Sequence, residues 1–338
     1  EETVINLTVK PGMKQGWFGN AYGGYGSKDR YEGNAMVNRF VNNDQITFMG
    51  GANNTNNMGF SDLASTMFSG MGGGGGRRGG FGAGSGITSS GNAGLNFSKE
   101  FKPDKLTLGG NTRYSHSDND ARSKSDRQNI LPGDSSSYDN SEAMSRTKSD
   151  NFGVDFRLEW KPDTMTHLIF RPSFSFSHSM NDNFSDATTL DNERDTVNTN
   201  KSSNYSESNG YNLNASIDFS RKLNNKGRVF SATLSGGNSD SYSDGMNRSD
   251  IVYFNQTDAL KNSIIDQRSR YDNKGFNYRA YVSWVEPIGH NNFIQATYSI
   301  SQRKQEALKN VYNQDADGIY NVLDSKAIAI TLSASGPA

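Results

Sequence analysis

The sequence predicts an all-β fold in which about 11–12 antiparallel strands run up and down in a transmembrane β-barrel, and these strands either close on themselves or form part of a larger barrel. Two observations predict this fold class. Apolar and polar residues alternate over many short runs, and the polar stretches between these runs are by turns short and long. Because side chains of a strand point to alternate faces, each run predicts a strand with one apolar and one polar face.

The clearest example is a predicted hairpin over 152–178 with its turn at 161–165. Before the turn, every second residue from Phe152 to Trp160 is apolar, and the residues between them are polar or glycine. After the turn, phenylalanines alternate with serines. The tight polar turn between two such runs is typical of a β-hairpin.

Similar runs precede and follow this hairpin. They lie at 4–9, 17–25, 31–40, 45–54, 87–101, 105–115, 211–219, 228–237, 276–284, 292–301 and, more weakly, 326–333. Short turns fall near residues 42, 103, 163, 225 and 289. The long polar connections, predicted as loops, are 55–86, 116–148, 179–207, 238–272 and 302–324. Outer-membrane barrels sort their connections in this way, with tight periplasmic turns and long outer loops, whereas a soluble sandwich has no reason to do so.

The composition agrees with a barrel that has a wet interior. Only 33% of residues are hydrophobic and the mean hydropathy is −0.78, which is poor material for a thick soluble core. An alternating strand needs apolar residues on one face alone. The net charge of −1 gives no reason to expect nucleic-acid binding, and the lack of cysteine excludes disulfides and thiolate chemistry. No apolar run approaches the ~18 residues of a membrane-spanning helix.

An aromatic residue ends the run that enters each short turn. These residues are Phe40, Phe101, Trp160, Phe219 and Trp284. If all runs belong to one sheet, the five rings lie at one height and form a girdle at the periplasmic membrane interface. The alternative is that the rings cap hydrophobic clusters, as aromatic side chains do in any sheet.

Charged residues on the polar faces are expected to line the barrel interior. They are Asp155, Arg157, Glu159, Arg171 and Asp218. We interpret them as a mutually neutralising lining that needs no substrate. The four histidines are not paired at metal-ligand spacing, and the other carboxylates are scattered through the predicted loops. The sequence therefore predicts no enzyme and no cofactor.

Two polar segments resemble binding motifs. The Gly-rich run 72–84 lacks the Gly-Lys-Ser/Thr ending of a phosphate loop, and its single Arg-Arg-Gly-Gly-Phe is a weak RNA-binding signal, so we interpret it as a flexible outer loop. The second segment matches the spacing of a calcium loop. Its possible Ca²⁺ ligands are Asn313, Asp315, Asp317 and Asp324. Weak calcium binding and a simple polar turn at 317–318 are the two interpretations.

The chain resembles the large outer-membrane β-barrel proteins of Bacteroidota, which are similar to TonB-dependent receptors. The stretches that carry this resemblance are Val4-Ile5-Asn6-Leu7, Gly16-Trp17-Phe18-Gly19-Asn20, Gly86-Ile87-Thr88, Tyr114 to Asp120, Leu158 to Asp163 and Tyr320 to Ser325. They cover nearly the whole chain, and each marks architecture and no chemistry. Relatives of this kind hold a plug inside a barrel of about 22 strands.

The resemblance implies that residues 1–12 end a plug or linker and that 13–338 form the N-terminal part of a larger barrel in a Gram-negative outer membrane. It implies import of a bulky nutrient, such as an iron chelate or a glycan, powered through the TonB complex. The chain departs from the family because it has no plug and no TonB-contacting segment. The alternatives are a scaffold barrel that transports nothing and a soluble extracellular β-sandwich that binds glycans.

Overall fold

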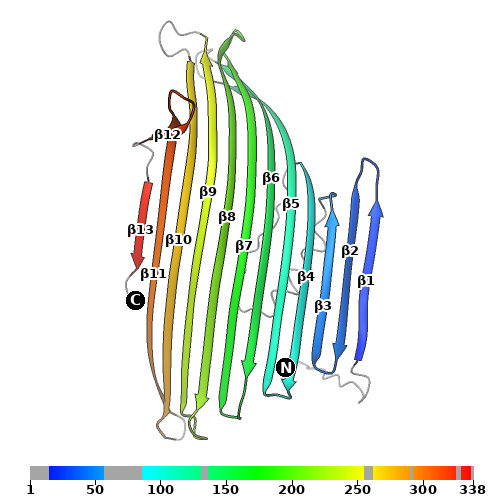
Figure 1. Ribbon diagram of the computed structural model, residues 1–338, viewed down its shortest axis with the longest axis vertical. Coiled ribbons are helices and arrows are strands. Elements are labelled where there is room, and N and C mark those ends of the chain that lie inside the picture. Colours follow the sequence, from blue (N-terminus) through cyan, green and yellow to red (C-terminus); the bar gives the residue numbers. More distant parts are fainter. Residues whose placement is uncertain are drawn as a thin grey trace.

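The computed structural model describes residues 15–56, 86–130, 136–254, 262–289, 292–324 and 329–335. The predicted plug end at 1–12 and the Gly-rich run 72–84 lie outside these residues. The described residues form one antiparallel sheet of thirteen strands (Figure 1). The strands are β1 (Gln15–Tyr25), β2 (Tyr31–Val41), β3 (Asp44–Asn53), β4 (Ile87–Lys102), β5 (Leu106–Asn129), β6 (Ser137–Trp160), β7 (Thr166–Leu190), β8 (Thr196–Lys222), β9 (Val229–Tyr253), β10 (Asn262–Pro287), β11 (Phe293–Gln314), β12 (Tyr320–Leu323) and β13 (Ala329–Ser335).

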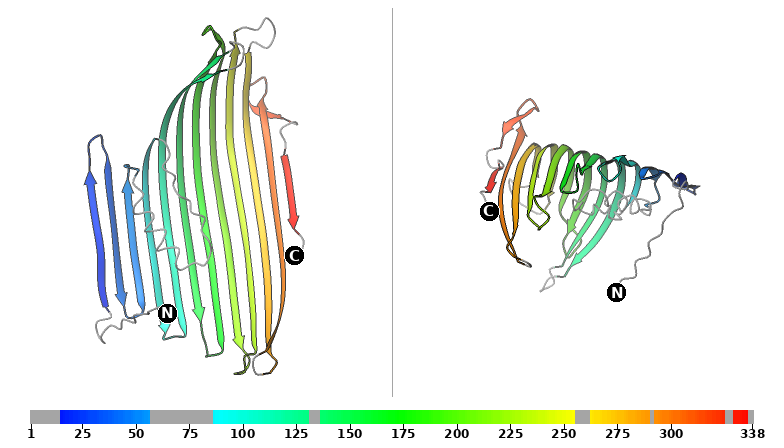
Figure 2. Two further views of the ribbon diagram at one scale, coloured as in Figure 1. Left: turned by 180° about the vertical axis from the view of Figure 1, so that it is seen from behind. Right: turned by 90° about the horizontal axis from the view of Figure 1, so that it is seen from below.

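The all-β, up-and-down arrangement is confirmed. From β1 to β12 every strand pairs with the next one in sequence, and β13 returns to pair with β11. The sheet curves along its width (Figure 2), but within the described ranges β1 does not meet β11, β12 or β13. The structure therefore contains an open, curved sheet.

In the part of the chain with described coordinates, no helix combines the length and the apolar character that crossing a membrane would require.

The prediction of four long loops was wrong. The stretches 116–148, 179–207, 238–272 and 302–324 are mostly strand, and β5 to β11 each contain 22 to 27 residues. These stretches are polar on both faces, so they show no alternation of apolar and polar residues. The backbone ladder nevertheless continues, and cross-strand contacts support it. One example is the pair formed by Ser185 and Ser202, whose hydroxyl oxygens lie 2.8 Å apart.

The short turns were predicted correctly. The connections from β2 to β3, β4 to β5, β6 to β7, β8 to β9 and β10 to β11 all lie at the lower end of the sheet in Figure 1. In the turn between β6 and β7, the Asp163 carboxylate accepts hydrogen bonds from the backbone N–H groups of Met165 and Thr166 at 2.8 and 2.7 Å. These hydrogen bonds stabilise the charged carboxylate, so the pKa of Asp163 lies below its ordinary value of 3.8.

Replacing Asp163 with alanine is expected to destabilise the protein in a pH-dependent way. A carboxylate with a lowered pKa contributes stability above its ordinary pKa of 3.8 and loses that contribution as the pH falls through the folded value. The urea midpoint of the Asp163→Ala variant should therefore lie below that of the wild type at pH 7, and the difference should shrink as the pH falls below 3.8. A difference that is the same at pH 7 and at pH 2.5 would contradict this role.

The strand register places most apolar residues of the long strands on one face. One row of directly opposed residues crosses five strands. It contains Leu108, Leu158, Phe170, Ile217 and Leu234. The most shielded side chains of the described residues lie on the opposite face. They are Met36, Met49, Asn34, Asn38, Thr47, Asn96, Asn111, Ser117, Ser283 and Val311. Since side chains converge on the concave side of a curved sheet, the shielded polar face is the concave one and the apolar face is convex.

Gly110 on the apolar face lies beneath two aromatic rings. It stands opposite Phe97 on β4 and Phe156 on β6, whose ring centroids are 6.4 Å apart in an edge-to-face arrangement. A Cβ atom added at Gly110 would lie 2.7 Å from the Phe97 ring and 2.8 Å from the Phe156 ring. We expect Gly110→Ala to lower the free energy of unfolding by about 1 kcal/mol, because both rings must move. Alanine at Gly91 is the matched control, since its Cβ would meet only the Gly51 carbonyl oxygen at 3.9 Å.

Candidate functional site

The convex face carries a wide band of exposed apolar side chains. The band runs from the short turns up to Tyr114, Phe152, Phe176 and Tyr211, which stand side by side in the register. Within it, Leu213 and Phe276 are each 50% exposed and Leu234 is 54% exposed. A contiguous exposed apolar surface marks a site of contact with a membrane or with a partner protein.

The aromatic residues predicted as a girdle do not all lie on this face. Trp160, Phe219 and Trp284 do, near the short turns. Phe101 lies at the register shift near the end of β4, with the Lys99 ammonium 5.6 Å from its ring centroid. Phe40 points to the concave face, which corrects the prediction. On β2 the odd-numbered residues, such as Val37, point to the convex face. Phe40 is even-numbered and therefore points to the other face.

Phe230 is an aromatic residue that the sequence analysis missed. Its ring centroid lies 6.3 Å from those of both Phe219 and Trp284, so it joins these two rings across three strands. It was missed because it follows a short turn instead of preceding one. Its position at the start of an alternating run was the available signal.

Above the apolar band, the same convex face carries a belt of ion pairs. Its ion pairs include Asp118 with Arg146, Asp186 with Lys201, Asp244 with Arg268, Asp266 with Arg248, and Glu306 with Lys304. Asp150 adds a hydrogen bond with His116. Asp118 accepts two hydrogen bonds from the Arg146 guanidinium, at 3.0 and 2.7 Å, and these hold the pKa of the Asp118 carboxyl below its ordinary value. On β6 and β10 the face changes from apolar to charged within two residues, from Phe152 to Asp150 and from Phe276 to Lys274.

The concave face is mostly neutral and rich in hydroxyl and amide groups. Its positions on β7 to β9 hold no charged residue from Ser173 to Thr189, from Asn198 to Ser216, or from Ser231 to Ser249. Serine and asparagine supply most of these positions. The sequence already contained this signal, because charged residues occupy every second position at Arg146, Lys148 and Asp150 while Thr147 and Ser149 lie between them.

The five charges predicted to line an interior all lie on the concave face, close to the short turns. Asp155 accepts a hydrogen bond from Arg113 at 2.7 Å, and Arg157 donates to Glu159 at 3.0 Å. Glu159 also pairs with Lys161 and with His167, at 2.7 and 2.9 Å. Each of these four contacts places a basic group beside a carboxylate, so the cluster offsets much of its own charge.

Arg171 and Asp218 form the remaining pair of this group. The Asp218 carboxylate accepts a hydrogen bond from the Arg171 guanidinium and another, at 2.8 Å, from the Thr233 hydroxyl. The Arg171 Nε atom is buried, and no group of the described residues forms a hydrogen bond with it. Asp218 is therefore the group that compensates the positive charge of Arg171 on this face.

A shallow hollow of about 350 Å³ opens on the concave face where Gly275 supplies no side chain. Ser239, Asn277 and Gln305 surround it with neutral polar groups. Arg303 adds one guanidinium, which donates to the Gln305 side chain at 3.1 Å. The arrangement suits a ligand that exchanges hydrogen bonds.

The four residues predicted as a calcium loop have separate roles. The Asp315 carboxylate accepts backbone N–H groups of Asp317 and Ile319, both at 2.9 Å, so it caps the turn. Asn313 and Asp324 both accept from the side chain of Gln267, at 3.0 and 3.3 Å. The described residues contain no group of three or more acidic, histidine or cysteine side chains placed to hold a metal ion. Calcium binding at these residues stays a prediction.

The histidines form hydrogen bonds with single partners across strands. His116 lies 2.7 Å from Asp150, His167 2.9 Å from Glu159, and His178 2.8 Å from Asn209. His290 lies outside the described residues. These contacts give each described histidine a structural partner in the ladder.

No protein-family model matches this chain, and no curated protein is significantly similar to it. The functional conclusion therefore rests on the chemistry of the two faces of the sheet. The convex face presents an apolar band below a charged belt, and the concave face presents neutral polar groups above a paired ionic cluster.

Proposed function

We propose that this chain forms the membrane-embedded wall of an outer-membrane β-barrel that imports a bulky nutrient, similar to a TonB-dependent receptor. The observation that carries the proposal is the apolar band on the convex face, which faces outward on strand after strand. Contact with lipid makes such an exposed apolar surface energetically favourable. An outward apolar band with aromatic residues at its border is characteristic of barrels in the outer membrane.

In this proposal the open sheet is completed by further strands. A strand edge in lipid would leave backbone N–H and C=O groups without partners, at several kcal/mol each. Among the described residues, the outer edge of β1 and residues 293–302 of the outer edge of β11 pair with no strand. Strands beyond those described would pair with them and close a barrel of about 22 strands, within the size range of outer-membrane barrels.

The orientation follows from the two ends of the sheet. Short turns face the periplasm in outer-membrane barrels, so the belt of ion pairs and the upper halves of β5 to β11 lie on the outer side. These polar hairpins, instead of irregular loops, would contact the cargo first. A plug and the TonB complex would supply gating and energy in the intact protein.

The neutral concave face favours an uncharged, hydroxyl-rich cargo such as a glycan over a charged iron chelate. Serine and asparagine side chains can exchange hydrogen bonds with hydroxyl groups along the whole height of β7 to β9. A charged cargo would lose hydration there without meeting opposite charges. Hydrogen-bond exchange of this kind permits binding without trapping the ligand.

The alternatives differ in what they require of the molecule. A scaffold barrel would share both faces but would lack a plug, so the presence of a plug in the intact gene product distinguishes it from an importer. A soluble sandwich requires a second sheet packed on the apolar face. The described strands all belong to one sheet, and the side chains of the band remain exposed.

Cell fractionation tests the proposal directly. The intact protein should appear in the outer-membrane fraction and migrate differently on a gel with and without boiling, because a closed barrel resists detergent until it is heated. A deletion strain should then lose growth on neutral glycans and keep growth on ferric chelates. A soluble protein without a mobility shift would refute the barrel, and unchanged growth on both nutrients would refute import.

A further inference from the structure

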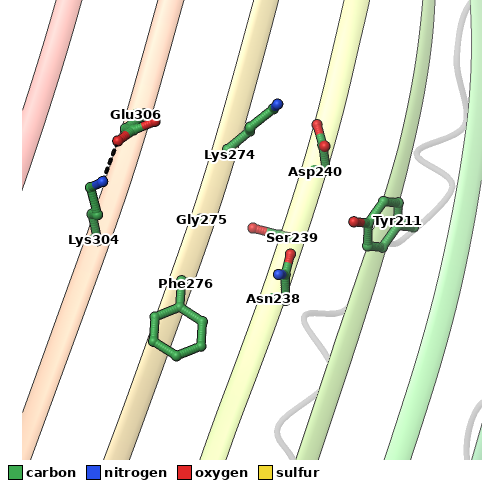
Figure 3. A pocket seen from close by; sticks show the side chains of 9 residues that line it. All are labelled: Tyr211, Asn238, Ser239, Asp240, Lys274, Gly275, Phe276, Lys304 and Glu306. Carbon is green, nitrogen blue, oxygen red and sulfur yellow. Dashed lines mark ion pairs between the residues drawn. The ribbon is translucent and has the colours of Figure 1, made fainter.

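A second hollow lies on the convex face, at the border between the apolar band and the belt of ion pairs. Its volume is about 230 Å³ (Figure 3). Phe276 on β10 and Tyr211 on β8 are its aromatic walls and are the highest apolar residues of their strands within the band. They are 50% and 40% exposed. The hollow therefore has one side in the apolar band and the other in the belt.

The polar side of this hollow carries two lysines and two carboxylates. Lys274 stands directly opposite Asp240 on β9 and Glu306 on β11. Lys304 stands opposite Phe276, two residues from Glu306 along β11, and its ammonium is 2.5 Å from the Glu306 carboxylate. Figure 3 shows Lys274 and Asp240 extending away from Phe276, whereas Tyr211 stands beside Asp240, its direct partner in the register. The charged ends therefore lie opposite Phe276.

This arrangement matches the chemical parts of one kind of amphiphile. Two ammonium groups can pair with a phosphate. Two carboxylates and the Asn238 amide can exchange hydrogen bonds with sugar hydroxyls, and exposed aromatic walls can contact acyl chains. A surface with only basic groups would suit any anion. The mixture of charges and hydrogen-bonding groups favours a headgroup that carries a phosphate on a sugar.

The geometry points to a binding site for the phosphorylated sugar headgroup of an acylated glycolipid at Lys274, Lys304, Asp240 and Tyr211, with the acyl chains against Phe276. The inference rests on the proposed membrane location, since only a bilayer places a lipid headgroup at this height. The hollow lies on the side away from the short turns, so the glycolipid belongs to the outer leaflet. The bound lipid would fix the depth at which strands β8 to β11 sit in the membrane.

The test measures lipid binding by the intact, detergent-solubilised protein with native mass spectrometry. The probes are a synthetic monophosphorylated, acylated glucosamine disaccharide, its dephosphorylated form, and phosphatidylethanolamine. The double variant Lys274→Ala/Lys304→Ala should bind the phosphorylated glycolipid about tenfold more weakly than the wild type, because two cations near the phosphate are lost. Its heat-dependent gel mobility should be unchanged, which shows that it is folded.

The matched control is Lys148→Ala/Lys201→Ala, which removes two lysines from the same belt but away from the hollow. It should bind the phosphorylated glycolipid as the wild type does. Equal losses in both double variants, equal binding of all three probes, or undiminished binding by the first variant would each overturn the inference. A protein absent from the outer membrane would instead refute the proposed function, so the two failures are distinguishable.

Discussion

Replacing Leu213 with arginine is expected to destabilise this protein in a bilayer. Leu213 lies in the apolar band between Phe174 on β7 and Asn238 on β9, and half of its side chain is exposed. In a barrel wall that exposed surface contacts lipid between the midplane, where an arginine costs about 2–4 kcal/mol, and the border of the band at Tyr211, where it costs about 0–1 kcal/mol. The free energy of unfolding of the intact protein, measured with urea in lipid vesicles, should fall by about 1–2 kcal/mol.

The neighbouring residue supplies the matched control. Asn212 points to the concave face, opposite Ser175 and Ser239, so Asn212→Arg places the same charge among neutral polar groups that water can reach. This variant should change the free energy of unfolding by less than about 0.5 kcal/mol. If both faces met water, Leu213→Arg would be as mild as the control, and the membrane proposal would be lost.

The second large effect is expected from Asp218→Ala. The substitution leaves the Arg171 guanidinium without its carboxylate partner and the Thr233 hydroxyl without its acceptor. Removing one member of a shielded ion pair is costly because the other charge stays behind. Since both side chains are about one-third exposed, the expected loss is about 2 kcal/mol, less than for a fully buried pair.

A double-mutant cycle isolates the interaction. Arg171→Met/Asp218→Ala removes both charges and should recover at least half of the loss caused by Asp218→Ala alone. Asp218→Asn keeps an acceptor for Thr233 and should fall between the alanine variant and the wild type. Additive effects of the two single substitutions would show that the pair is not coupled, and the ionic cluster would then need a role other than neutralisation.

These two predictions address opposite faces of the same sheet. The first depends on what surrounds the convex band, and the second depends on how the concave face balances its own charges. A protein that tolerates arginine at Leu213 yet needs Asp218 would be a water-soluble sheet with an ionic cluster. The reverse outcome would favour a lipid-facing wall whose interior charges are free to meet a cargo.

The alternating pattern determined a large part of this fold without any structure. A period of two is local, so it predicted the apolar and polar faces of the hairpin over 152–178, and turn residues predicted each short connection. The concave placement of Asp155, Arg157 and Arg171 followed from the same alternation. Phe40 was the exception, because it lies at an even-numbered position of β2, whereas the convex residues of this strand, such as Val37, are odd-numbered.

The tertiary structure alone decided what the polar stretches do. A stretch that is polar on both faces has no apolar period, and only its pairing partners show that Asp118 meets Arg146 or that Asp244 meets Arg268. The same long-range register brings Arg171 to Asp218 and assembles the two hollows around Gly275. The sequence by itself therefore determined the strand faces, which are set within a few residues. The register, fixed by contacts between distant strands, determined the length of the sheet and the make-up of its sites.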